Sequence, residues 1–192
     1  MKKFTVFALA VCVCVVVFPG CTAREIYELL ADNYVVGAIE GDTFESEWLG
    51  LRFTAPEGFV MEETAQQYID LAEVAVVSEM TAMLPDAIAS ATLVAERLLS
   101  SNINIEQYVE AAFGQLEDEI GWDVAFSDDI AEIEFAGETW YTYTADIHAF
   151  DMDFSYRYLA RIFGNRMALI AIYSLAGEED NIDLLMAAFE AY

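Results

Sequence analysis

Basic residues are scarce in this chain, and lysine is confined to its first three positions. The 192 residues include 34 acidic and 8 basic ones, with a formal net charge of −26 at pH 7. Lys2 and Lys3 are the only lysines, and every acidic residue follows Cys21. Such a surface repels phosphate, because nucleic-acid binding depends on Lys and Arg to neutralise the backbone. The composition therefore argues against nucleic-acid binding and favours solubility, diffuse cation binding or a basic partner.

Histidine and cysteine are also nearly absent. His148 is the only histidine, so the sequence excludes histidine-based zinc clusters and most arrangements that use histidine as a general base. Of the three cysteines, Cys12 and Cys14 precede Cys21, so a chain that begins at Cys21 forms no internal disulfide. No nucleophile-elbow, P-loop or dinucleotide-binding pattern occurs. We expect a protein that is not an enzyme. An acidic hydrolase is a minor alternative, for which no feature selects the carboxylates.

The first twenty residues predict an export signal. Lys2 and Lys3 precede an apolar run over residues 4–18, which is shorter than the roughly 20 residues that span a bilayer. The run ends in Phe18-Pro19-Gly20-Cys21, which resembles the lipobox of bacterial lipoproteins. We expect residues 1–20 to be a lipoprotein signal peptide, Cys21 to be lipidated, and residues 21–40 to form the anchor and a short tether. Soluble secretion after a cut behind Ala23 is the alternative.

Strands dominate the predicted order beyond residue 34. We expect strands at residues 35–46, 49–55, 122–126, 130–135, 139–147, 152–163 and 166–174, and a hairpin turn at Gly164-Asn165. Helical periodicity predicts helices over residues 61–77, over 104–120 with Asn104 as N-cap, and from Ile182 onward. The last helix should bury Ile182, Leu185, Met186 and Phe189. Residues 79–99 are compatible with two strands around Pro85-Asp86 or with a helix capped by Asp86.

This order predicts an α+β fold, or α/β sandwich, with a largely antiparallel β-sheet flanked by helices. Gly41-Asp-Thr-Phe44, Trp48-Leu-Gly-Leu-Arg-Phe53 and Pro56-Glu-Gly-Phe59 resemble the opening of PsbP/Mog1-like domains, which occur in many bacterial lipoproteins. The resemblance covers residues 41–192 as a single domain and favours a strand over residues 89–98. It implies no catalytic residue, since relatives serve as binding or assembly modules with different partners.

A group of oxygen and imidazole ligands lies at the tip of a predicted hairpin. Asp146, His148, Asp151 and Asp153 could hold a divalent cation such as Ca²⁺. The spacing is not that of an EF-hand, because Tyr156 stands where that loop requires glycine. An exposed polar hairpin end without a bound ion is the alternative.

Basic and aromatic side chains gather on the predicted strands. Arg157, Arg161 and Arg166 could form an anion site, or pair with carboxylates and cover apolar surface. An aromatic face could stack on a ligand or form the core beneath a helix. Its members are Tyr141, Tyr143, Phe154, Tyr156 and Tyr158.

These patterns together predict a non-catalytic, membrane-anchored binding or assembly module outside the cytoplasm. We expect it to need no cofactor, to attach to the membrane through Cys21 and to have an envelope protein as partner. The alternative is an extracytoplasmic domain that binds a small ligand or a divalent cation at the hairpin tip.

Overall fold

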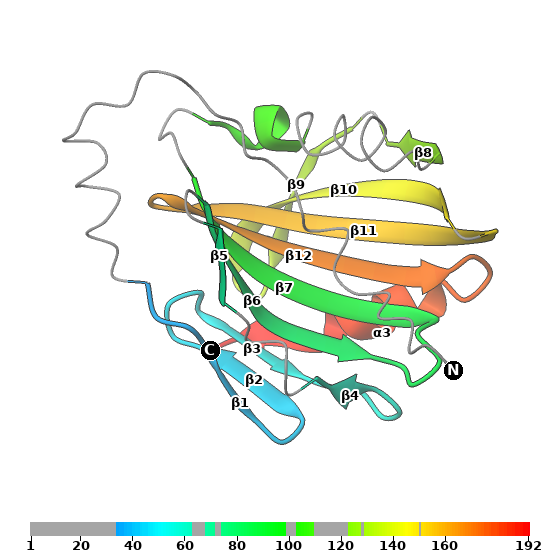
Figure 1. The fold of residues 1–192 in the computed structure, drawn as a ribbon, viewed down its shortest axis with the longest axis horizontal. Helices are drawn as coiled ribbons and strands as arrows, with labels where there is room; N and C mark the ends of the chain where they lie inside the picture. The colour runs from blue at the N-terminus through cyan, green and yellow to red at the C-terminus, as the bar shows by residue number, and fades with distance from the viewer. Residues whose placement is uncertain are drawn as a thin grey trace.

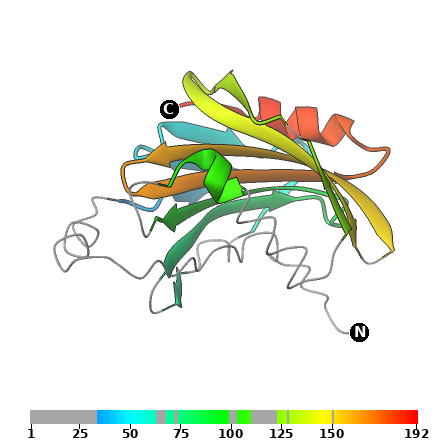
Figure 2. The same ribbon diagram turned by 90° about the horizontal axis from the view of Figure 1, so that it is seen from above.

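The computed structural model describes residues 34–62, 68–71, 74–98, 103–109, 123–127, 129–149 and 151–192. They form two antiparallel sheets, a C-terminal helix and a helical segment at residues 105–109. Figure 1 shows the long strands of the larger sheet side by side, with the smaller sheet beneath them in this view. Figure 2 shows the smaller sheet and the C-terminal helix on the same side of the larger sheet. The predicted α+β class with a largely antiparallel sheet is confirmed.

The smaller sheet brings the first and last described strands together. It has the order β1-β2-β3-β13, with every neighbouring pair antiparallel. Its strands are β1 (Ala38–Glu40), β2 (Thr43–Ser46), β3 (Leu51–Thr54) and β13 (Phe189–Ala191). Because side chains alternate along a strand, Phe44, Phe53 and Phe189 all enter the core in one cross-strand row.

The larger sheet has the order β4-β6-β7-β12-β11-β10-β8, with β5 paired to β6 and β9 paired to β10. Its first strands are β4 (Val60–Met61), β5 (Tyr68–Leu71), β6 (Val74–Met83) and β7 (Ala89–Arg97). The later ones are β8 (Asp123–Phe126), β9 (Ala131–Phe135), β10 (Glu138–Ala149), β11 (Met152–Phe163) and β12 (Arg166–Leu175). The central strand β12 is a nearly continuous apolar run because both faces of the sheet are covered.

Two hydrophobic clusters lie on opposite faces of the larger sheet. The first is enclosed by the smaller sheet and by α3 (Asp180–Ala187), which contributes Ile182 and Leu185. The second contains the buried tyrosines of β10 and β11, together with Ile105, Tyr108 and Val109 of the helical segment. The domain is therefore layered, with the larger sheet in the middle.

Several sequence predictions are confirmed. The strands predicted over residues 152–163 and 166–174 are β11 and β12, and they meet at the Gly164-Asn165 turn, where Gly164 has a φ of 59°. The strand favoured over residues 89–98 is β7. Asn104 is the N-cap, since its Oδ1 accepts the Gln107 backbone N–H at 2.8 Å. The C-terminal helix begins at Asp180, and Phe189 lies just beyond it in β13.

The helix predicted over residues 61–77 is wrong. The described part of that range belongs to β4, β5 and the start of β6. A short apolar sequence fits a helical and an extended period equally well, and Val74, Val76 and Val77 favour the extended form. Pairing with β7 decides between them, because it supplies a hydrogen-bonding partner along β6.

The domain also begins before the predicted boundary at residue 41. β1 pairs with β2 through Ala38, Ile39 and Glu40, so these residues belong to the smaller sheet rather than to a tether. The signal peptide predicted at residues 1–20 and the lipidated Cys21 lie outside the described residues.

Candidate functional site

A β-bulge in β6 turns a carboxyl group into the interior. Ser78 pairs with Val94 and Met80 pairs with Leu93, so Glu79 has no cross-strand partner residue. An extra residue in one strand breaks the alternation of side chains and redirects the one it carries. Glu79 is completely buried as a result. The bulge therefore places an ionisable group within the protein core.

The N-terminal segment supplies the hydrogen-bond partners of Glu79. Its Oε1 accepts the hydroxyl of Tyr34, and its Oε2 accepts the backbone N–H of Gly37 at 2.8 Å. Burial raises the pKa of Glu79, while these two hydrogen bonds and the charge of Arg166 oppose that rise. The carboxyl group thus ties residues 34–37 to the larger sheet.

Arg166 and two aromatic rings enclose Tyr34. The Arg166 Cζ atom lies 4.0 Å from the centre of the Tyr34 ring, in a cation–π arrangement. Trp48 meets that ring edge-on at 5.0 Å and also packs against Phe163 at 5.0 Å. Arg166 is 3% exposed. We call Tyr34, Glu79, Arg166, Trp48 and Phe163 the N-terminal clamp.

Glycine is required next to the clamp because a side chain has no room there. A Cβ atom at Gly37 would lie 2.4 Å from Cε2 of Phe44 and 2.8 Å from the carbonyl oxygen of Glu45. The backbone of residue 37 therefore packs directly on the core, which lets its N–H reach Glu79.

A second buried carboxyl group lies on the other face of the sheet. Glu96 of β7 is 4% exposed and accepts the hydroxyl of Tyr108 at 2.6 Å. Burial raises the pKa of Glu96 to about 7, against the opposing effect of that hydrogen bond. Glu96 and Tyr108 join the helical segment at residues 105–109 to the sheet.

The predicted hairpin tip forms, but its ligands are divided between separate contacts. Ala149 pairs with Met152, which places Asp151 in the turn with a φ of 61°. The Nδ1 atom of His148 lies 2.7 Å from Oδ1 of Asp153. Asp146 instead accepts the Ser155 hydroxyl at 3.0 Å. Among the described residues, no group of three or more His, Cys, Asp or Glu side chains could hold a metal ion.

The three arginines predicted as a group lie in different environments. Arg157 faces Asp183 of α3, with its Nη1 atom 3.6 Å from the carboxylate. Arg161 binds Glu138 at 3.0 Å and stacks on Phe163. Arg166 instead belongs to the N-terminal clamp. Arg157 and Arg161 therefore each lie beside a carboxylate of another element.

The aromatic face lies largely in the core. Tyr158 stacks between Tyr143 and Tyr156, with ring centres 4.9 and 5.6 Å apart, and Tyr156 also contacts Tyr173. Burial raises the pKa of each of these hydroxyl groups above that of free tyrosine. The core alternative is confirmed for Tyr143, Tyr156 and Tyr158.

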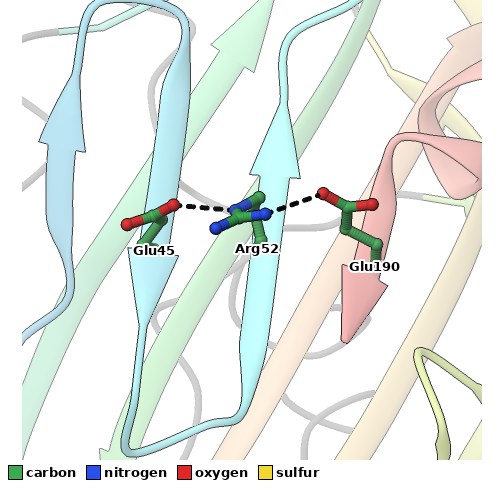
Figure 3. Close-up of polar contacts among 3 residues, drawn as sticks. All are labelled: Glu45, Arg52 and Glu190. Atoms are coloured by element: carbon green, nitrogen blue, oxygen red, sulfur yellow. Dashed lines mark hydrogen bonds and ion pairs between the residues drawn. The ribbon is translucent and has the colours of Figure 1, made fainter. Parts of the chain in front are cut away.

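The outer face of the smaller sheet carries a row of charges. Glu45, Arg52 and Glu190 are cross-strand neighbours on β2, β3 and β13. Figure 3 shows Arg52 between the two carboxylates, and its nitrogens lie 2.7 Å from Glu45 and 3.4 Å from Glu190. All three side chains are well exposed, so the pairs contribute little to stability.

The clamp and Glu96 were not identified from the sequence. Each glutamate lies in a strand made mostly of apolar residues, within Val-Val-Ser-Glu79-Met of β6 or Leu-Val-Ala-Glu96-Arg of β7. A charged residue inside such a run is rarely buried unless it has a partner, and that pattern is the available signal. The partners, Tyr34 and Tyr108, are distant in sequence or on another element and carry no motif.

Comparisons with known proteins identify the fold. No protein-family model and no curated protein matches the chain. The chain is similar to the solution structure of CyanoP, the cyanobacterial PsbP of Synechocystis sp. PCC 6803. The TM-score is 0.53 and the identity 11%, over 85% of this chain and 99% of that one. LpqN, a Mycobacterium tuberculosis protein involved in cell envelope biogenesis, aligns with a TM-score of 0.41 and 10% identity, over 90% and 98% of the chains. The likeness to CyanoP shows that this chain has a PsbP-like fold.

Proposed function

We propose that this chain is a non-catalytic binding or assembly module, anchored to the outer face of the cytoplasmic membrane through lipidated Cys21. The signal-like residues 1–20 and the lipobox-like Phe18-Pro19-Gly20-Cys21 support the location. Within the described residues, no helix is long and apolar enough to cross a membrane. In this proposal the lipid is the means of attachment.

The main support for this proposal is that the buried ionisable side chains make contacts within the fold. Glu79 binds Tyr34 and Gly37, Glu96 binds Tyr108, and Arg166 stacks on Tyr34. Each of these contacts joins one part of the fold to another. Perturbed ionisable groups that serve catalysis face a cleft, where a substrate can reach them. The arrangement described here supports a rigid scaffold that presents its outer surface to a partner.

The strong negative charge indicates the kind of partner. Surface electrostatics guide association and select partners of opposite sign. A net charge of −26 at pH 7 favours an envelope protein with a basic surface. Such an encounter weakens as salt rises, because at 0.1 M salt the interactions between exposed charges more than about 10 Å apart are largely screened.

Crosslinking of the full-length protein in its own cells, followed by pull-down and mass spectrometry, tests the proposal. Cys21→Ala is the matched control, since it removes the acylated residue and leaves the described domain unchanged. We expect one dominant envelope protein with the wild type and a reduced yield with the control. Phase partition in detergent should place the wild type in the detergent phase and Cys21→Ala in the aqueous phase. Equal partition of both proteins would contradict the anchor, and failure to enrich a partner would contradict the binding module.

A further inference from the structure

We propose that the N-terminal clamp fixes the orientation of the domain on the membrane. The end that carries Trp48 and Phe163 then lies nearest the lipid surface, and the β10–β11 hairpin tip lies farthest from it. This inference rests on the proposed anchor at Cys21. The orientation would determine which surface of the domain is presented to a partner in the envelope.

The clamp determines where the chain leaves the domain toward its anchor. Tyr34 is held by a hydrogen bond to buried Glu79, by the guanidinium of Arg166 and by the edge of Trp48. Three parts of the fold, β6, β12 and the turn before β3, therefore contact this one residue. A segment with so many buried contacts opens only at a substantial free-energy cost. The chain between Cys21 and the domain must therefore start from this point.

The two ends of the larger sheet are far apart. β11 runs for 12 residues from Met152 at one turn to Phe163 at the other. At a rise of about 3.3 Å per residue, the strand is roughly 40 Å long. Phe163 packs on Trp48 of the clamp, whereas Met152 adjoins Asp151 and Asp153 at the hairpin tip. The point of attachment and the acidic tip therefore lie at opposite ends.

The length of the chain that precedes the domain favours this orientation. Residues 21 to 34 extend by at most about 45 Å, and full extension loses most of the conformational freedom of that segment. Bringing the tip to the lipid surface would require nearly that full extension.

Fluorescence quenching in vesicles tests the orientation. The lipidated protein is purified from membranes and placed in phosphatidylcholine vesicles that contain a nitroxide-headgroup lipid. One fluorophore is attached through Glu47→Cys, an exposed position beside Trp48, and in a second sample through Met152→Cys, which is 44% exposed at the tip. We expect at least a threefold stronger quenching at position 47. Equal quenching, or stronger quenching at position 152, would overturn the orientation.

Two controls separate this inference from the proposal on which it rests. Flotation of the labelled proteins with the vesicles tests the anchor alone, and proteins that stay in solution would refute the proposed function instead. Tyr34→Phe removes the hydroxyl that binds Glu79 and retains the ring. If the clamp sets the orientation, this variant floats with the vesicles, and the difference in quenching between positions 47 and 152 falls at least twofold. An unchanged difference would show that the clamp has no part in it.

Discussion

Replacing Glu96 by glutamine should stabilise the protein at neutral and alkaline pH. Glu96 is buried beside Tyr108, and burial raises its pKa from 4.5 to about 7. The folded protein therefore holds this proton more tightly than the unfolded chain does. The contribution of Glu96 to stability is fully present below pH 4.5, falls as the pH rises toward 7, and stays absent above it. Glutamine has nearly the same shape and still offers an oxygen to the Tyr108 hydroxyl.

The size of the effect follows from the change in pKa. Since one pKa unit corresponds to about 1.4 kcal/mol, ionised Glu96 costs the fold on the order of 3 kcal/mol at pH 8. At pH 5 the cost is about 1 kcal/mol, because Glu96 is then largely protonated in the folded state. We expect Glu96→Gln to raise the free energy of unfolding by roughly 2 kcal/mol more at pH 8 than at pH 5.

Urea unfolding at several pH values between 5 and 8, followed by circular dichroism, measures this difference. The matched control is Glu106→Gln, which removes a charge from an exposed residue of the helical segment that carries Tyr108 and leaves Glu96 in place. The comparison isolates Glu96, because Glu79 and Glu62, whose pKa values are also raised by burial, are present in both variants. If Glu96→Gln differs from the wild type in stability by the same amount at pH 5 and pH 8, Glu96 does not have a raised pKa in the folded protein.

Three further predictions concern the clamp and the hairpin tip. Tyr34→Phe should lower the free energy of unfolding by about 1–3 kcal/mol in urea titrations, because buried Glu79 loses a donor; an unchanged midpoint would contradict that. Gly37→Ala should lower the free energy of unfolding by about 1–3 kcal/mol or more in the same assay, because its Cβ would overlap the Phe44 ring. An unchanged free energy would contradict the close packing of residue 37 on Phe44. Calcium should raise the melting temperature by the same unsaturable amount in wild type and in Asp151→Asn/Asp153→Asn, through screening alone; a saturable rise lost in the variant would establish the cation site.

Elements of the fold that have a local cause can be predicted from the amino-acid sequence. The alternation along β10, the apolar run along β12, the Gly164-Asn165 turn and the Asn104 cap each depend on residues a few positions apart. The same local patterns indicated an α+β fold, and the resemblance over residues 41–192 indicated the PsbP-like arrangement. The hairpin that carries Asp146 and Asp153 was predicted on the same basis.

Features that depend on partners far away in the sequence follow from the packing of the whole fold. Residues 68–71 and 74–77 are extended because β5 pairs with β6 and β6 pairs with β7, although their apolar spacing also fits a helix. The bulge can bury Glu79 because Tyr34 donates a hydrogen bond to its carboxyl group and the charge of Arg166 lies nearby. These two residues are 45 and 87 positions away from Glu79 in the sequence. A sequence pattern records which side chains are apolar and how they repeat. It does not record which remote residue satisfies a buried charge, because that partner is chosen by packing of the whole fold.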